Sequence, residues 1–187
     1  MTTVGVLALQ GDVREHLTTL QSLGVGATPL KKSEQLESLD ALVIPGGEST
    51  TIGKMAARFD LLEPLRDAVD DGLPTYGTCA GLILLAGSVT DGDQPLLGVL
   101  DIVVRRNAFG RQNESFEADL DIAGLDEPFH AVFIRAPWVE KVGSDVEVLA
   151  TIDEHAVMVR QDTILASSFH PELTGDGRIH RMLLDLI

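Results

Sequence analysis

The only cysteine of the chain, Cys79, lies in the segment GTCAG between a strand-like run and a helix-like run. The two glycines allow a sharp strand-to-helix turn, which holds a nucleophile out at the carboxyl end of a sheet. The helix N-terminus would favour the thiolate over the thiol, and the Ala80 N–H would point toward a developing oxyanion. A lone cysteine is more often inert packing. The glycines and the strand–helix context favour a nucleophile over packing.

A cysteine nucleophile needs a base whose ring is held by a third group. His170, in SSFHPEL, ends a strand-like run, and Glu172 follows two positions later. We expect an extended chain through Pro171 to put both side chains on one side, where Glu172 accepts the imidazole N–H. Two alternatives stay open: a surface strand end with a loop acid, and a metal site completed by a further His or carboxylate.

The other histidines give weaker signals. His16 and His180 fall within helical patterns and are expected at the surface. His130 and His155 lie near the starts of strand-like runs, with no evident carboxylate to orient them. His170 is therefore the candidate base.

A second glycine-rich junction, IPGGEST at residues 44–50, also joins a strand-like run to a helix-like run. A glycine N–H here could be the second oxyanion donor, and losing such a donor costs about 2.7–4 kcal/mol of transition-state stabilisation. An ordinary glycine turn with Ser49 as helix cap is the alternative. Phosphate binding is a weaker hypothesis, because no Lys follows the glycines and Glu48 would repel phosphate.

Two arginines have unusual surroundings. Arg106 lies in VVRRNAFGRQ, and Arg135 interrupts the apolar run AVFIRAP. An arginine buried without a partner is costly, so each should pair either with a structural acid or with a substrate carboxylate.

Strand–helix alternation in the first half would position these motifs. Strand-like runs at 4–9, 41–47 and 73–79 alternate with helix-like runs that start after Asp12, at Ser49 and after Cys79, and a further helix is expected at 61–72. Such alternation predicts a parallel sheet with helices on both faces. Asp12 and Ser49 are the expected N-caps.

The second half is different. Strand-like runs at 96–106, 115–122, 130–137, 146–152, 156–161 and 164–170 follow one another closely, and a helix is expected at 178–187. They predict antiparallel additions to the sheet. The expected fold class is α/β: three layers, with a mostly parallel central sheet. No linker or repeat divides the chain, so we expect one domain over residues 1–187.

Composition excludes several function classes. The chain has 187 residues, of which 44% are hydrophobic, and its 14 Lys and Arg against 29 Asp and Glu give a net charge of −15. This balance argues against nucleic acid or anionic membranes as partners. One cysteine, no basic n-region and no apolar run of membrane-span length indicate a cytoplasmic protein. The acidity would suit a salt-rich cytoplasm.

Seven stretches, in order along the chain, carry a family resemblance: LQGDVREH, PGGEST, GTCAG, RNAFGRQ, FEADL, VFIRAP and SFHPELTGD. GTCAG with FHPEL resembles class I (triad-type) glutamine amidotransferases, which have a flavodoxin-like fold. PGGEST, RNAFGRQ and FIRAP more closely resemble the glutaminase-subunit family of pyridoxal 5′-phosphate synthases.

The resemblance implies a role for each motif residue. Cys79 would attack the side-chain amide of L-glutamine and form a thioester, His170 would shuttle protons, and Glu172 would orient His170. Backbone N–H groups of Gly46, Gly47 and Ala80 would form the oxyanion hole. The positions that match the family's glutamine-binding residues are Gly47, Glu48, Ser49, Arg106, Ile134 and Arg135. Either arginine could hold the glutamine carboxylate.

The resemblance also implies a partner and no cofactor or metal. The partner would be a separate (β/α)₈-barrel synthase subunit that receives ammonia and makes the vitamin B6 cofactor. In this family the glutaminase is active only within the complex, which completes the oxyanion hole; a peptide flip at Gly46–Gly47 would be chemically suitable. Alternatives are an intracellular cysteine hydrolase or stress protein of related fold, and a non-catalytic regulatory subunit.

Overall fold

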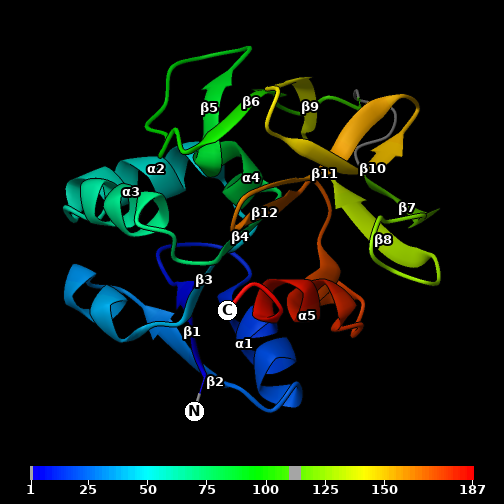
Figure 1. Cartoon of the computed structure of the whole chain (residues 1–187). Coiled ribbons are helices and arrows are strands. Elements are labelled where there is room, and N and C mark those ends of the chain that lie inside the picture. The colour runs from blue at the N-terminus through cyan, green and yellow to red at the C-terminus, as the bar shows by residue number, and fades with distance from the viewer. Residues whose placement is uncertain (1, 110–114) are drawn as a thin grey trace.

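The computed structural model describes residues 2–109 and 115–187, and within them one long curled sheet of ten strands runs through the molecule (Figure 1). Its first part is parallel and has the order β2-β1-β3-β4-β12. These strands are β1 (Thr3–Leu7), β2 (Gly26–Leu30), β3 (Ala41–Ile44), β4 (Thr75–Thr78) and β12 (Ile164–Ser167). Their carboxyl ends therefore meet at one edge, where the chemical motifs begin.

The sheet continues beyond β12 mainly through antiparallel pairs, in the order β11-β9-β6-β5, with β10 paired to β11. These strands are β5 (Ala86–Val89), β6 (Leu100–Arg105), β9 (Trp138–Val142), β10 (Glu147–Ile152) and β11 (His155–Gln161). A separate antiparallel hairpin is formed by β7 (Ser115–Leu120) and β8 (Phe129–Ile134). The predicted antiparallel additions in the second half are confirmed.

Helices cover both faces of the parallel part (Figure 1). On one face lie α1 (Val13–Ser22) and α5 (Arg178–Leu184); on the other lie α2 (Ser49–Arg58), α3 (Leu62–Asp70) and α4 (Ala80–Leu85). Side chains of β3 alternate between two apolar clusters, with Leu42 and Ile44 packed toward α2–α4 and Ala41 and Val43 packed toward α1 and α5. The predicted three-layer α/β class is confirmed.

Some elements differ from the sequence prediction. Strands β2 and β9 were not predicted, because GATPL and WVEKV each bury few side chains and are held mainly by backbone pairing. The helix expected after Cys79 is short: it ends at Leu85, and the chain continues directly into β5. The described residues also form the 3₁₀ turns η1 (Ser33–Ser38) and η3 (Pro171–Leu173). No helix in the described part of the chain is long and apolar enough to span a membrane.

Candidate active site

Cys79 occupies the single-residue turn between β4 and α4. Its backbone has φ 49° and ψ −97°, a strained conformation for a non-glycine residue, and its N–H donates to the Ser167 carbonyl at 2.7 Å. A side chain at Gly81 would overlap the carbonyl oxygen of Ile44, and one at Gly77 would lie 2.6 Å from a Leu85 methyl. The two glycines of GTCAG therefore let the helix pack directly on β3 and β4.

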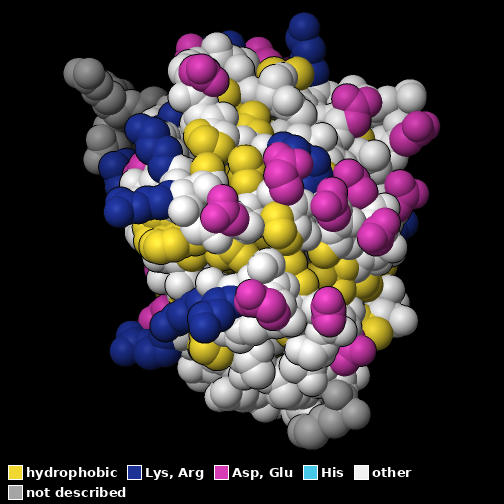
Figure 2. Space-filling view, turned by 90° about the vertical axis from the view of Figure 1, so that its left-hand side faces the viewer, with side chains coloured by type: hydrophobic (Ala, Val, Ile, Leu, Met, Phe, Trp, Pro, Cys, Tyr) yellow, Lys and Arg dark blue, Asp and Glu magenta, His cyan; other side chains and the backbone are white. Residues whose placement is uncertain are grey.

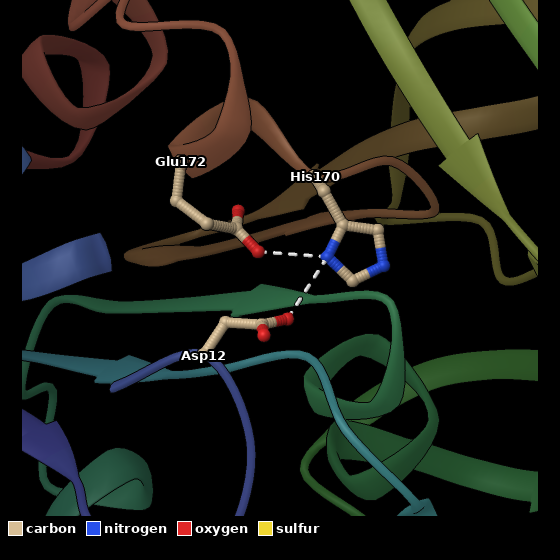
Figure 3. Close-up of side chains that lie close together, drawn as sticks. All are labelled: Asp12, His170 and Glu172. Carbon is tan, nitrogen blue, oxygen red and sulfur yellow. Dashed lines mark hydrogen bonds and ion pairs between the residues drawn. The ribbon is translucent and has the colours of Figure 1, made fainter. Parts of the chain in front are cut away.

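His170 and Glu172 form a buried pair just beyond β12. The Nδ1 of His170 lies 2.7 Å from Oε1 of Glu172 (Figure 3), and the two residues are 4% and 6% exposed. The expected extended chain through Pro171 is wrong, because residues 171–173 form the 3₁₀ turn η3. The turn still brings the carboxylate back to the ring. The alternative of a surface strand end does not fit this burial.

Asp12 is a third member of this cluster that sequence reasoning did not assign to it. Its Oδ2 lies 3.4 Å from Nδ1 of His170 (Figure 3). We expected Asp12 to cap α1, but its side chain makes no capping hydrogen bond. It follows β1 at the same sheet edge that β4 and β12 reach, and this position was the available signal.

The three charges of the cluster affect one another. Burial lowers the pKa of His170, but hydrogen bonds with Asp12, Cys79 and Glu172 outweigh burial, so the pKa is raised above its usual value. Burial raises the pKa of the Glu172 carboxyl, and the nearby His170 opposes that rise. The imidazolium of His170 is thus favoured beside two acids, which stabilise the positive charge that the ring gains when it accepts a proton.

The same cluster supplies the extra ligand that the metal alternative needed. One atom each from Asp12, His170 and Glu172 lie within 4.8 Å of one another. Both carboxylates converge on the same ring nitrogen, however, and the 2.7 Å separation from Glu172 is that of a direct hydrogen bond. We therefore interpret the cluster as a hydrogen-bonded base.

A cavity of about 380 Å³ opens in front of Cys79 and His170, within the usual range for small-molecule sites. It is lined by residues from the ends of β1, β3, β4, β6, β8 and β12: Gln10, Asp12, Gly47, Glu48, Ser49, Cys79, Ala80, Ile83, Arg106, Asn107, Ile134, Arg135 and His170. All six positions matched to glutamine binding are in this lining. The glutamate of the candidate triad lies behind the histidine ring, outside the lining. Residues 110–112 of the RNAFGRQ motif lie outside the described residues.

Neither arginine is a buried, unpaired charge. Arg135 follows β8 with φ 42° and is exposed, and Arg106 is half-buried with its Nη2 3.7 Å from Oε1 of Glu48. Both guanidinium groups border the cavity and could reach a carboxylate placed there.

The Gly46–Gly47 turn is held on both sides by the segment that follows β1. The Gly46 carbonyl accepts from the Asp12 N–H at 3.2 Å, and the Glu48 N–H donates to Oε1 of Gln10 at 2.7 Å. Because this peptide is trans, the Gly47 N–H points to the side opposite Asp12. A side chain at Gly46 would overlap the His170 ring, so the turn lies directly against the base.

The expected Ser49 cap is wrong. Helix α2 begins at Ser49, and the carboxylate of Glu48 caps it by accepting from the N–H groups of Thr50 at 3.1 Å and Thr51 at 2.8 Å. Hydrogen bonding, chiefly from the Thr51 hydroxyl, lowers the pKa of Glu48 against a smaller opposing effect of burial. The Ser49 hydroxyl instead donates to Oε1 of Gln94 at 3.1 Å.

Three expectations about the other histidines are also corrected. His16 and His180, expected at the surface, are fully buried, and Nδ1 of His16 lies 2.9 Å from Nε2 of His180. Their burial results from the packing of α1 beside α5, which local patterns do not reveal. His130 does have carboxylate partners, Asp119 and Glu117, each at 2.9 Å across the β7–β8 hairpin. His130 is exposed and does not line the cavity.

Comparisons with known proteins give matches over nearly the whole chain. The profile of the SNO glutamine amidotransferase family matches residues 6–187. Two relatives, each named pyridoxal 5′-phosphate synthase subunit PdxT, come from Frankia alni (60% identical, 98% of this chain and 94% of the relative) and Mycolicibacterium smegmatis (57%, 97% and 97%). A crystal structure of a glutamine amidotransferase superposes with TM-score 0.94 at 55% identity, over 98% of this chain and 97% of the other.

Proposed function

This chain belongs to the SNO glutamine amidotransferase family, and from that premise we propose that Cys79, His170 and Glu172 are its catalytic triad. The protein is a glutamine amidotransferase of pyridoxal 5′-phosphate synthesis, which releases ammonia from L-glutamine. One observation carries the assignment of residues. The strained Cys79 and the ring of His170, which Glu172 holds from behind, meet at one cavity lined by the positions matched to glutamine binding.

Acylation follows from these positions. Nδ1 of His170 is held by Glu172, which leaves Nε2 to take the thiol proton of Cys79. The sulfur attacks the amide carbon of glutamine, and the carbonyl oxygen becomes an oxyanion. The Ala80 N–H at the start of α4 and an N–H of the Gly46–Gly47 turn are the proposed donors to that oxyanion. The imidazolium then protonates the leaving nitrogen, and ammonia departs from a glutamyl thioester.

Deacylation reverses the proton path. Neutral His170 removes a proton from water, which attacks the thioester carbon through a second oxyanion. Collapse of this intermediate breaks the carbon–sulfur bond and releases glutamate, and the imidazolium returns its proton to Cys79. Glu172 keeps the ring oriented and stabilises its charge in both halves of the reaction.

The amino-acid end of glutamine would lie farther from Cys79. We propose that Arg106 or Arg135 binds the α-carboxylate, since both border the cavity and neither is buried. The ionised Glu48 and nearby backbone carbonyls suit the α-ammonium. Glu48 also caps α2, so binding there must share a carboxylate that already accepts helix N–H groups.

The remaining proposals concern assembly and location. We propose that the ammonia passes to a (β/α)₈-barrel synthase subunit, in a hetero-oligomeric complex that switches the glutaminase on. We also propose that residues 1–187 act as a single glutaminase domain in the cytoplasm, consistent with the single cysteine, which is free.

The deciding experiment is Cys79→Ala assayed with the synthase subunit present. Glutamate release should fall to background while the unfolding temperature and complex formation stay unchanged, because only the attacking atom is lost. Continued glutamate release would refute the mechanism. Labelling of Cys79 by a glutamine-analogue electrophile would exclude a non-catalytic subunit, and loss of activity to a chelator would instead support the metal alternative.

A further inference from the structure

A second buried polar pair lies behind the triad. Oε1 of Glu172 faces His170, and its other oxygen, Oε2, lies 3.4 Å from Nε2 of His16. Nδ1 of His16 is in turn 2.9 Å from Nε2 of His180. The side chains of His16, His180 and Glu172 are shielded from solvent. The groups therefore form a continuous line from the cavity to the layer where α1 packs beside α5.

The hydrogen-bond partners available to the two histidines favour one tautomer of His180. Within the described residues, Oε2 of Glu172 and Nδ1 of His180 have no hydrogen-bond partner at strict geometry. If His180 carried its proton on Nδ1, that buried N–H would have no acceptor. Its Nε2 would then accept from Nδ1 of His16, which would leave Nε2 of His16 without a proton and facing the carboxylate of Glu172. If His180 instead donates from Nε2 to Nδ1 of His16, the Nε2–H of His16 faces Oγ1 of Thr78 at 3.3 Å and Oε2 of Glu172 at 3.4 Å. The unpaired atoms, Nδ1 of His180 and Oε2 of Glu172, are then both acceptors, which cost less than an unpaired donor.

Thr78 connects the same ring to the nucleophile. Its Oγ1 lies 3.3 Å from Nε2 of His16, and Thr78 is the last residue of β4, directly before Cys79. The Nε2–H of His16 therefore lies between a hydroxyl on the nucleophile's strand and the carboxylate that holds the base. One ring contacts both halves of the proposed catalytic apparatus.

Both rings are suited to remain neutral. Burial lowers the pKa of His16 well below its usual value, and the neighbouring His180 and His170 lower it further. Burial also lowers the pKa of His180 to about 4. The groups packed around the pair are Glu172 and Thr78 beside His16, and the Tyr76 ring against His180. Neutral donors can fix Glu172 without competing with His170 for the positive charge.

We propose that His16 is a positioning residue for glutamine hydrolysis, which fixes the second oxygen of Glu172 so that the first can hold His170, and that His180 sets the tautomer of His16. The inference rests on the proposed function of Cys79, His170 and Glu172. In this arrangement, the orientation of the Glu172 carboxylate depends on the packing of α1 beside α5. His16 does not touch the substrate and acts through Glu172.

The test replaces His16 in the complex with the synthase subunit. His16→Leu should lower kcat for glutamine hydrolysis about 10–100-fold, by analogy with removal of the hydrogen-bond partners that orient metal ligands, with KM nearly unchanged. His16→Gln keeps an N–H donor at the position of Nε2 and should recover most of the loss. His16→Asn, whose donor matches only Nδ1, should stay low.

A double-variant cycle tests the role of His180. His180→Leu should lower kcat less than His16→Leu, and the double variant should be no slower than His16→Leu alone, because His180 acts through His16. The matched control is Leu20→Ala, one helical turn along α1, which removes a fully buried side chain that belongs to the core. It should lower stability by about 2–5 kcal/mol without a comparable loss of kcat.

Each outcome decides the proposal. An unchanged kcat in folded His16→Leu would overturn it, as would equal rates for His16→Gln and His16→Asn; the latter comparison also serves if His16→Leu does not fold. Additive losses in the double variant would refute the role of His180. Cys79→Ala in the same complex distinguishes failure of the proposed function from failure of the His16 proposal. If Cys79→Ala remains active, the proposed function fails. If Cys79→Ala is inactive and His16→Leu is fully active, only the role of His16 is rejected.

Discussion

The protonation state of His170 depends on three neighbours that come from different parts of the chain. Asp12 and Glu172 both approach its Nδ1, at 3.4 and 2.7 Å, and Cys79 interacts with the same ring. An opposite charge at such distances favours the imidazolium. Asp12 is the least expected of the three, because the sequence assigned it to a helix cap. Its charge therefore bears directly on the proposed base.

Replacing Asp12 by Asn should lower the pKa of His170, because a negative charge that stabilises the imidazolium is removed while the shape is kept. In an NMR titration, the midpoint for the His170 ring should move to lower pH. Glu15→Gln is the matched control, since it removes one charge from the same helix without contacting His170. Equal titration of Asp12→Asn and the unaltered protein would show that Asp12 does not act on the base.

The stability of the protein at acid pH should depend on the buried His180. Burial lowers its pKa to about 4 in the folded protein, against about 6.5 when unfolded, so the unfolded chain binds an extra proton between these values. The free energy of unfolding should therefore fall as the pH drops from 6.5 toward 4, by on the order of 2–3 kcal/mol from this residue. His180→Gln cannot take up that proton and should show a shallower fall in urea unfolding series. An unchanged slope would contradict this explanation.

Local sequence identified the candidate triad residues better than the residues packed behind them. Cys79, His170 and Glu172 could be proposed because strand ends, glycines and a proline surround them in the chain. His16 and His180 could not, since each lies in an ordinary helical pattern. The two histidines are 164 residues apart in the chain and come together only through tertiary packing. Local sequence periodicity does not predict such a contact.

At the scale of elements, the junction of β4 and α4 depends on the absence of side chains at two positions. The six residues of α4 are all buried, and a Cβ at Gly81 would overlap the Ile44 carbonyl. Because backbone cannot rotate away as a side chain can, the helix would have to shift. The turn that holds Cys79, the proposed nucleophile, would move with it.

Gly81→Ala should therefore destabilise the fold by about 1–3 kcal/mol and reduce glutamine hydrolysis. Thermal unfolding and glutamate release in the complex would measure the two effects. Gly87→Ala in β5 is the control, because a Cβ there meets its nearest neighbour, the Leu100 carbonyl oxygen, at an ordinary 3.4 Å. Similar behaviour of the two variants would refute the packing argument.

The elements themselves were predicted unevenly for physical reasons. Strands that bury both faces, such as β3, give continuous apolar runs and were found from sequence. Strand β2 contains Pro29 and buries only Leu30, so its strand character arises from pairing with β1. The turn η3 was mistaken for extended chain, because a proline can also start a helical turn as its first residue.

At the scale of the whole molecule, excess negative charge is spread over the surface. Figure 2 shows acidic side chains scattered over one face, with basic ones gathered mainly toward its left edge. The net charge of −15 opposes the compact state through self-repulsion. Salt shortens the range of that repulsion to about 10 Å at 0.1 M and about 3 Å at 1 M.

The unfolding temperature should accordingly rise as salt is increased from low to molar concentration. Thermal unfolding in sodium chloride measures this, and sucrose at matched water activity controls for effects unrelated to charge. No rise with salt would mean that self-repulsion does not limit stability, and it would remove the argument for a salt-rich habitat.

The strand order has a consequence for synthesis on the ribosome. Strand β12 lies between β4 and β11, so a central position of the sheet is filled by a segment translated after both of its neighbours. Until residues 164–172 emerge, β4 lacks its parallel partner β12, and Cys79 lacks His170, its proposed base. The sheet is therefore closed, and the proposed triad brought together, only after the last strand and the turn that follows it have been translated.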